Sequence, residues 1–451
     1  MEGIKDLFVN PGREYRAKPF WAWNGKLEKD ELKRQLEVIK KMGFGGFFMH
    51  SRTGLATEYL GEEWFDITNF VADEAEKMGL EAWLYDEDRW PSGTAGGMVT
   101  KNPEYRIKYM RMSVIPSSDF RIDSNTIACF GAKIEENNLI EYKRVQTSFD
   151  AKGYEKILVF EIVMGKSSTW FNNTTYLDTM DKDAVQAFIE STHEKYKSKC
   201  GERLGKSIKG IFTDEPERGS LIRGSGCDFP IDGQYIPYTR KLFSEFIKKF
   251  GYDLIDHLPE LWFVYKEQVI NQATWHYILL LQDLFCENYF KRINTWCKDN
   301  SLIFTGHAIE ESTLASQIDF AGSLMRCYEE MEYPGMDMLT ANRYFWTDVK
   351  QLSSVAHQTG KKWMLSELYG ATGWDFNFEG HKNVGSWQSL YGISLRCPHL
   401  SWYTMSGEAK RDYPASILHQ SAWYGEYKRV EDYFARFAVL NTETNPVCDI
   451  L

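Results

Sequence analysis

Short apolar runs that end in acidic residues constrain the fold of this chain more than any other feature. Each run has the length and composition of a buried strand, and its last residues turn polar. Four such runs end in Asp86-Glu87-Asp88, Asp214-Glu215-Pro216, Asp337 and Glu367. Because a parallel barrel collects the carboxyl ends of its strands at one face, we expect these acids to meet there.

The apolar runs alternate with longer segments of helical pattern along most of the chain. Residues 29–42, for example, place Leu32, Leu36 and Ile39 on one helical stripe. Such alternation is typical of βαβ units and predicts an α/β fold, a (β/α)8 TIM barrel. An open doubly wound sheet is the alternative, although no glycine-rich phosphate turn supports it. The eight predicted strands are 19–23, 45–49, 80–85, 210–213, 302–305, 335–339, 363–366 and 400–404.

The alternation breaks between the third and fourth predicted strands. Several strand-like runs separated by turn residues predict a β-rich insertion at about 110–165. The catalytic barrel is otherwise predicted to span residues 1–435. The segment after strand four is predicted to be mostly helical, with its last helix over about 265–297. Residues 436–451 are interpreted as an exit segment toward a further C-terminal domain, because 448–451 resembles the start of another strand.

Composition and charge narrow the class of partner. A net charge of −11 disfavours nucleic acid, whose phosphates need a basic surface. The 15 Trp and 25 Tyr suit a carbohydrate-handling protein, because flat rings pack against sugar faces. The sequence has no CxxC pair, no apolar run of membrane-spanning length and no secretory signal. These features predict a cytoplasmic enzyme; a secreted or periplasmic protein whose signal was trimmed is the alternative.

Two glutamates at the ends of predicted strands four and seven form the predicted catalytic pair. Pro216 cannot continue a strand ladder and favours an extended Glu215 at the rim. A rim carboxyl that is shielded from water has a raised pKa and can act as a general acid. Strand seven lies across the barrel mouth from strand four, so Glu367 can flank the same glycosidic bond. For each acid, a helix cap or a rim salt bridge is the structural alternative.

Other residues at strand ends are predicted to bind substrate or metal. Asp86, Glu87 and Asp88 offer the oxygen ligands that calcium takes, although an ordinary charged loop explains them equally well. The absence of HxH and HExxH patterns counts against a zinc hydrolase. Trp275, Leu279, Phe285 and Tyr289 are interpreted as helix packing. Glu310, Glu311, Glu329 and Glu330 are reserve catalytic acids. The predicted substrate-binding residues are Trp23, His50, Arg52, Asp86, Trp90, Asp214, His307, Glu329, Trp374 and Arg411.

Several of these segments together resemble the glycoside hydrolases of family 106, the α-L-rhamnosidases, and their relatives. The resemblance runs from about residue 15 to 435 and is carried by 19–25, 45–55, 83–93, 212–216, 365–370 and 411–414. It implies a barrel followed by β-sandwich domains, a bound calcium, and an inverting two-glutamate mechanism acting on α-L-rhamnosidic or similar terminal bonds. By position, Glu215 resembles the general acid and Glu367 the general base. A non-catalytic or truncated carbohydrate-binding barrel is the alternative.

Overall fold

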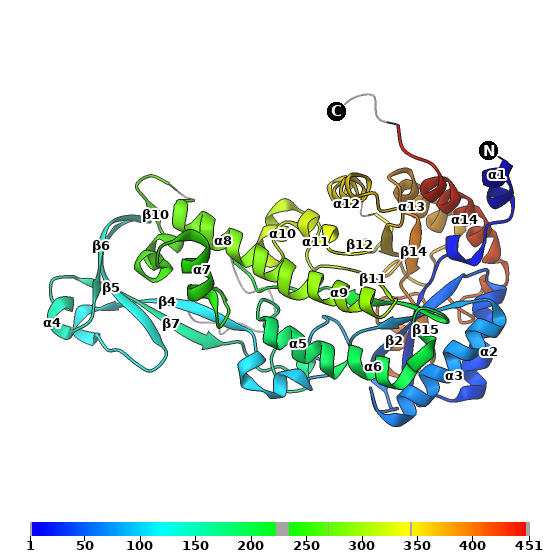
Figure 1. The fold of residues 1–451 in the computed structure, drawn as a ribbon, viewed down its shortest axis with the longest axis horizontal. Coiled ribbons are helices and arrows are strands. Elements are labelled where there is room, and N and C mark those ends of the chain that lie inside the picture. The colour runs from blue at the N-terminus through cyan, green and yellow to red at the C-terminus, as the bar shows by residue number, and fades with distance from the viewer. Residues whose placement is uncertain (1, 222–233, 269, 343–344, 448–451) are drawn as a thin grey trace.

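The molecule is elongated, with a barrel at one end and a β-rich lobe at the other (Figure 1). The computed structural model describes residues 2–221, 234–268, 270–342 and 345–447. The strand predicted at 448–451 lies outside the described residues. Both termini lie at the barrel end, where helix α1 (Glu2–Val9) packs against helix α14 (Lys428–Glu443) (Figure 1).

The barrel strands are parallel and follow one another around the sheet in chain order. This arrangement confirms the predicted (β/α)8 fold, with each strand close to its predicted position. Its strands are β1 (Phe20–Gly25), β2 (Gly46–Leu55), β3 (Glu81–Tyr85), β8 (Ile208–Asp214), β11 (Ile303–His307), β12 (Tyr333–Met338), β13 (Leu365–Leu368), β14 (Leu395–Pro398) and β15 (Ser401–Trp402).

The eighth strand is interrupted, and its two pieces close the barrel. The first piece, β14, pairs with β13, whereas the second, β15, pairs with β1. Between them the His399 amide still donates to the Leu368 carbonyl at 2.8 Å. The strand predicted at 400–404 therefore begins five residues earlier, at Leu395. Pro398 hid this start from the sequence pattern, because proline has no N–H to offer a strand ladder.

Helices cover the outside of the barrel. Two of them, α5 (Lys182–Ser191) and α6 (His193–Cys200), follow one another and are separated at Thr192. No described helix is both long enough and apolar enough to cross a membrane. The helices of the barrel layer are α2 (Lys29–Lys41), α3 (Glu62–Met78), α5 (Lys182–Ser191), α6 (His193–Cys200), α9 (Arg292–Asp299), α10 (Leu314–Phe320), α11 (Leu324–Glu329), α12 (Trp346–Thr359), α13 (Phe378–Leu390) and α14.

Alternate side chains of the strands fill the barrel interior. Because successive strand residues point to opposite faces, Phe20 packs inward while Trp21 packs against the helices. The inward rings of Phe20 and Phe212 lie 4.8 Å apart, edge to face. Further inward residues of this buried cluster are Phe48, Trp83, Tyr85, Leu365, Leu395 and Cys397. The apolar plug places the next inward position of each strand at the barrel mouth.

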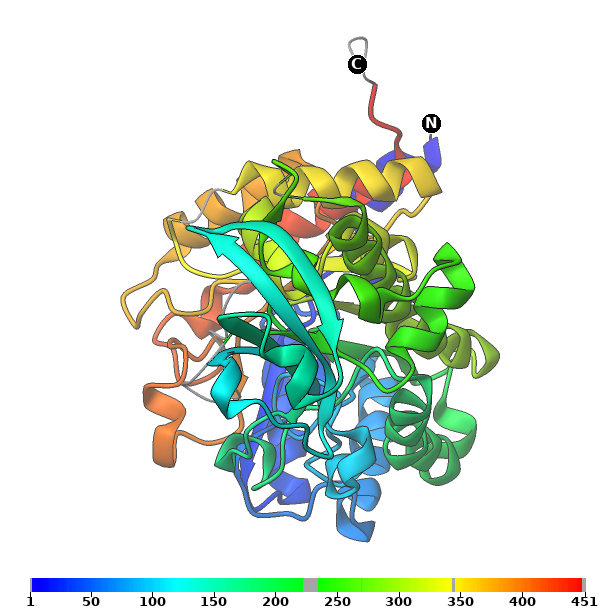
Figure 2. The same ribbon diagram turned by 90° about the vertical axis from the view of Figure 1, so that its left-hand side faces the viewer.

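The lobe is built on a second sheet, which stands in front of the barrel in Figure 2. Its central strands confirm the β-rich insertion between the third and fourth barrel strands. They are β4 (Lys108–Pro116), β5 (Thr126–Glu135), β6 (Asn138–Val145) and β7 (Lys156–Met164), with the short helix α4 (Ser148–Ala151) between the last two.

The segment after β8 contributes to this sheet as well as to the helical layer. Two short strands, β9 (Gln234–Tyr238) and β10 (Val264–Tyr265), pair with β4 and β6. Helix α7 (Leu242–Phe250), a 3-10 helix (Leu254–Leu261) and helix α8 (Gln272–Phe285) complete the lobe, and a π-helix (Cys286–Lys291) joins α8 to α9. The helix predicted from residue 265 begins at Gln272, because the Asn271 side chain caps it by accepting from the Thr274 amide.

Candidate active site

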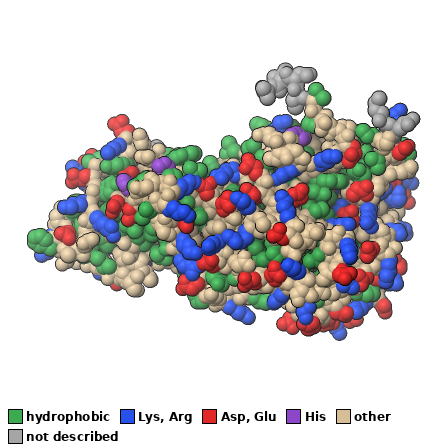
Figure 3. All heavy atoms as spheres, viewed as in Figure 1, with side chains coloured by type: hydrophobic (Ala, Val, Ile, Leu, Met, Phe, Trp, Pro, Cys, Tyr) green, Lys and Arg blue, Asp and Glu red, His purple; other side chains and the backbone are tan. Residues whose placement is uncertain are grey.

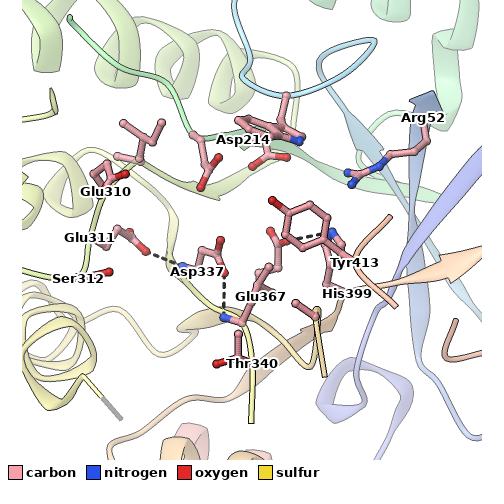
Figure 4. A pocket seen from close by; sticks show the side chains of 16 residues that line it. Arg52, Asp214, Glu310, Glu311, Ser312, Asp337, Thr340, Glu367, His399 and Tyr413 are labelled. Atoms are coloured by element: carbon pink, nitrogen blue, oxygen red, sulfur yellow. Dashed lines mark hydrogen bonds and ion pairs between the residues drawn. The ribbon is translucent and has the colours of Figure 1, made fainter. Parts of the chain in front are cut away.

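A cavity of about 470 Å³ opens at the carboxyl ends of the barrel strands (Figure 4). Asp337 and Glu367 lie in it between Glu311 on one side and His399 and Tyr413 on the other. Carboxylates dominate its lining: Asp214, Glu215, Glu310, Glu311, Asp337 and Glu367. The basic side chains among the described lining residues are Arg52 and His399.

The two-residue period of the strands delivers most of these side chains. Asp214 follows the inward Phe212 by two positions, and Glu367 follows the inward Leu365 by two. The register of the strands then places these side chains at the same height in the barrel, because Asp214 pairs with His307 and Asp337 pairs with Glu367. The apolar core layer and the acidic mouth layer are consequently successive rungs of the same strands.

The Glu367 carboxyl group lies between two histidine side chains. Its Oε2 contacts His307 Nε2 at 2.8 Å, and its Oε1 lies 3.6 Å from His399 Nε2. His307 Nε2 also approaches Asp214 Oδ1, at 3.6 Å. Burial raises the pKa of Glu367 well above its usual range, and the Asp214 charge adds to that rise. The geometry suits a carboxylate that must be held still and exchange a proton.

Glu215 lies one residue past its strand and reaches the cavity by a backbone turn. Its φ is +47°, in the left-handed region, so the extended conformation predicted from Pro216 is wrong. The turn lets the Glu215 amide donate to the His307 carbonyl at 3.1 Å. Burial and then the charges of Asp214, Asp337, Glu367 and Glu311 raise the pKa of Glu215 well above its usual range. A carboxyl group whose pKa is raised favours its protonated form and suits a general acid.

Asp214 is fixed by two neutral hydroxyl groups, one donating to its side chain and one accepting from its amide. Its Oδ2 accepts from the Tyr85 hydroxyl, and its amide donates to Ser92 Oγ at 2.8 Å. Arg52, which is 5% exposed, makes a bidentate pair with Asp412 at 2.9 and 2.7 Å. The guanidinium at the rim is therefore already engaged by a carboxylate of the chain.

The acidic loop after β3 does not form the predicted metal site. Both Glu87 oxygens accept from backbone amides, among them those of Thr94 at 2.7 Å and Ala95 at 2.8 Å. Asp86 accepts from Ser92 Oγ, while Asp88 accepts from Ser51 Oγ. The three carboxylates thus serve separate partners, and the residues predicted to hold calcium do not fit it.

One set of ligand atoms does converge among the described residues: Asp214, His307 and Glu367 offer atoms within 4.8 Å of one another. This set also fits calcium poorly, because calcium takes six to eight oxygen ligands and the set includes an imidazole. The 2.8 Å contact between His307 and Glu367 further occupies the two groups with each other.

The structure divides the remaining predicted substrate-binding residues. Arg52, Trp90 and Asp214 line the cavity, and His307 lies beneath Glu367. The prediction is wrong for Trp23, which is fully buried on the outward side of β1 against Trp64.

The structure places five further predicted substrate-binding residues outside the cavity lining. His50 is fully buried and stacks on Tyr85 at 3.8 Å, and Asp86 lies below the mouth. Glu329 is exposed at the end of α11, ahead of β12, which is the amino-terminal side of the barrel. Arg411 is exposed and pairs with Glu408, while Trp374 is 44% exposed and donates to the Lys410 carbonyl.

Two ring-bearing residues of the cavity lining, His399 and Tyr413, are absent from the predicted substrate-binding residues. His399 follows Cys397 by two positions and continues its inward row, but the misplaced eighth strand concealed it. Tyr413 lies beside the predicted Arg411, and its ring centre is 5.4 Å from that of His399. Its φ of +50° turns the ring toward the cavity, a feature that no sequence pattern signals.

Comparison with known proteins points to one family. The model of glycoside hydrolase family 106, described as alpha-L-rhamnosidase, matches residues 171–451. A rhamnosidase structure from Novosphingobium sp. PP1Y superposes with a TM-score of 0.71 over 97% of this chain and 60% of its own, at 15% identity. A Formosa agariphila protein, named provisionally as a beta-glucuronidase, is 21% identical over 99% of this chain and 42% of its own length. The chain therefore spans less than two thirds of either relative.

Proposed function

Because the chain belongs to glycoside hydrolase family 106, the alpha-L-rhamnosidase family, we propose that it hydrolyses terminal α-L-rhamnosidic bonds with inversion, using Glu215 and Glu367. The observation that carries the proposal is that these two glutamates, from separate strands, line one cavity at the barrel mouth.

Each glutamate has one role in the proposed reaction. Protonated Glu215 gives its proton to the glycosidic oxygen as the bond from that oxygen to the anomeric carbon breaks. Glu367 accepts a proton from the water that attacks the anomeric carbon from the opposite face. The products are the free sugar with inverted configuration and the released alcohol. This geometry predicts about 6.5–9.5 Å between the carboxyl groups, against about 5–5.5 Å in a retaining enzyme.

The charge of the cavity supports a neutral sugar over a uronic acid, the sugar class in the name of the Formosa protein. Six carboxyl groups line the cavity, and its one described guanidinium is paired with Asp412. A substrate carboxylate would enter this field without a free cation to balance it, which is costly away from water.

Calcium stays part of the proposal only as an implication of the family, and no step of the reaction passes through it. Dialysis against EDTA, followed by assay with and without added Ca²⁺, tests this implication directly. An unchanged rate and unchanged melting temperature after chelation would count against a resident cation.

Aryl glycosides test the function. We expect p-nitrophenyl α-L-rhamnoside to release its chromophore, and p-nitrophenyl β-D-glucuronide to release none. Proton NMR during hydrolysis should show β-L-rhamnose as the first product. If no glycoside in a panel of rhamnose, fucose, galactose and arabinose derivatives is cleaved, the alternative of a carbohydrate-binding barrel gains support.

A further inference from the structure

A second cavity, of about 390 Å³, lies on the lobe rather than on the barrel. It is formed by the end of α7, the 3-10 helix, the hairpin after β10 and the start of α8. These elements stand beside the second sheet at the far end of the molecule from α14 (Figure 1). None of its lining residues lines the catalytic cavity: Phe250, Tyr252, His257, Glu260, Tyr265, Lys266, Gln268, Asn271, Gln272 and Ala273.

Three half-buried aromatic rings line this cavity, and the surrounding structure fixes them. Phe250 stacks on His276 with ring centres 4.0 Å apart and planes 5° apart. The Tyr252 hydroxyl lies 3.0 Å from His276 Nδ1. Tyr265 packs edge to face on Tyr142 at 5.6 Å. Rings held in place before binding lose little conformational entropy when a ligand arrives.

The hairpin that carries Tyr265 is bent by two residues in the left-handed region. Lys266 and Glu267 have φ values of +50° and +63°, although neither is a glycine. The amides and carbonyls of Tyr265 and Gln268 close the turn, at 3.2 and 3.0 Å. This backbone holds the Tyr265 ring over the cavity, with Lys266 Nζ 4.9 Å from the ring centre.

A buried carboxylate supplies the polar part of the lining. The Glu260 side chain is 9% exposed, and its Oε1 accepts from the Tyr142 hydroxyl and lies 2.8 Å from His257 Nδ1. Its Oε2 has no hydrogen-bond partner within the parts of the chain that the structure describes. The Gln268 and Gln272 side chains are exposed at the edge of the cavity and also lack partners there.

A fourth ring extends this surface beyond the cavity. Trp275 is 57% exposed on α8, so its interpretation as helix packing is wrong, whereas Phe285 and Tyr289 of the same series are fully buried. Residues three apart on a helix share a face, which places Trp275 beside Gln272. Histidine and hydrophobic side chains gather on this part of the lobe in Figure 3.

We infer that the lobe carries a second, non-catalytic binding site for a neutral saccharide, centred on Tyr252, Tyr265 and Glu260. Sugars present apolar C–H faces that pack on aromatic rings and hydroxyl groups that need acceptors and donors. The site offers both: fixed rings, a buried carboxylate oxygen and two amide side chains. Lys266 and Glu260 oppose each other in charge, which disfavours a strongly charged ligand. The inference relies on the proposed function only for the choice of carbohydrate as the ligand class.

Affinity electrophoresis tests the site. The probes are soluble rhamnan, galactan, arabinan and xyloglucan, each cast into its own native gel, and the protein is the inactive Glu367→Gln variant. We expect at least one polysaccharide to retard this variant. Tyr265→Ala and Trp275→Ala should each weaken the apparent affinity by about tenfold, the effect of losing one stacked ring.

Matched controls separate binding from folding. Phe149→Ala removes an 82% exposed ring from the same lobe, outside the cavity, and should leave retardation unchanged. Tyr265→Phe keeps the ring and should retain most of the affinity. Hydrolysis of p-nitrophenyl α-L-rhamnoside is measured in protein that keeps the native Glu367, and neither Tyr265→Ala nor Trp275→Ala should change its rate.

Two results would overturn the inference: no retardation by any of the four polysaccharides, or retardation that both alanine variants preserve. The second result would assign the binding to the barrel. Because the aryl glycoside assay does not depend on the lobe, failure of the second site and failure of the proposed function are read from different measurements.

Discussion

Two acidic regions follow neighbouring strands of the barrel and have different fates. After β3, Glu87 is buried among backbone amides that turn back to meet its oxygens. After β8, Glu215 faces Asp337, Glu367 and other acids across an open cavity. In the first region fixed dipoles compensate a carboxylate, whereas in the second like charges oppose one another. The contrast separates an acid that shapes a loop from the acids that we propose for proton transfer.

Burial acts on both acids in the same direction, so burial alone does not distinguish them. It raises the pKa of Glu87 to about 7, while the amides of Gly96, Asp88 and Ala95 oppose that rise. For Glu215 the neighbouring charges act with burial instead of against it. The identity of the neighbours, donors or acids, therefore decides the role of each carboxyl group.

The largest effect should come from Glu367→Gln. Loss of the proposed base should lower kcat by roughly 10³-fold or more for every substrate, the upper part of the range for acid–base catalysis. Steady-state rates on p-nitrophenyl α-L-rhamnoside and on a rhamnosyl disaccharide measure it. The control is Glu329→Gln, an exposed acid at the other end of the barrel, which should keep the wild-type rate. Near-normal turnover of Glu367→Gln would remove this residue from the mechanism and direct attention to Asp337.

The loss of activity in Glu215→Gln should depend on the leaving group of the substrate. A proton donor matters most when the departing alcohol is a poor leaving group, so the disaccharide should lose about 10²–10⁴-fold and the nitrophenyl glycoside far less. The ratio of the two kcat/KM values measures the difference. Equal losses on both substrates would contradict the role of Glu215 as acid.

The strands and the insertion could be predicted because their signals are local. Apolar runs and turn residues mark each barrel strand, and Asp214 and Glu367 follow from the position of a strand end. Trp23 could not be rejected from sequence, because residues 20–23 are all apolar and only the structure shows that Phe20 and Ala22 point inward.

Long-range features were beyond this reasoning. The role of Glu87 depends on how 93–96 turn back over it, and β9 and β10 depend on pairing with strands far away in the chain. Tyr413 reaches the cavity through a left-handed residue after an interrupted strand. Each of these features is decided by tertiary contacts, which periodicity does not record.

Glu87→Gln should destabilise the fold instead of the chemistry. The new amide group would direct its own N–H donors at backbone N–H groups, and unfolding free energy should fall by about 3 kcal/mol, the scale of hydrogen bonds to a charged group. Urea unfolding followed by circular dichroism measures the change. If stability is unchanged, the amide cradle contributes little and the contrast between the two acidic regions is weaker than proposed.

The smallest effect is expected on the stability of the Glu215→Gln variant. Its sign is opposite to that of Glu87→Gln, because this substitution should stabilise the fold. The folded-state pKa of Glu215 is raised above its unfolded value of about 4.3, so the folded protein binds this proton more tightly. Its contribution to stability is complete below pH of about 4 and is lost as the pH rises through the folded pKa. Glutamine does not titrate and has no such loss, so the free energy of unfolding of the variant should increase relative to that of the wild type as the pH rises.

Melting temperatures of the wild type and of Glu215→Gln at pH 5 and pH 8 measure this difference. Each unit of raised pKa corresponds to about 1.4 kcal/mol, so the advantage of Glu215→Gln should grow from pH 5 to pH 8 with the size of the upward shift. Glu367 and Glu311 also have raised pKa values, and the variant removes one like charge from their surroundings, which adds to its advantage at high pH. A constant or shrinking advantage would show that Glu215 is ionised in the folded protein without a loss of stability.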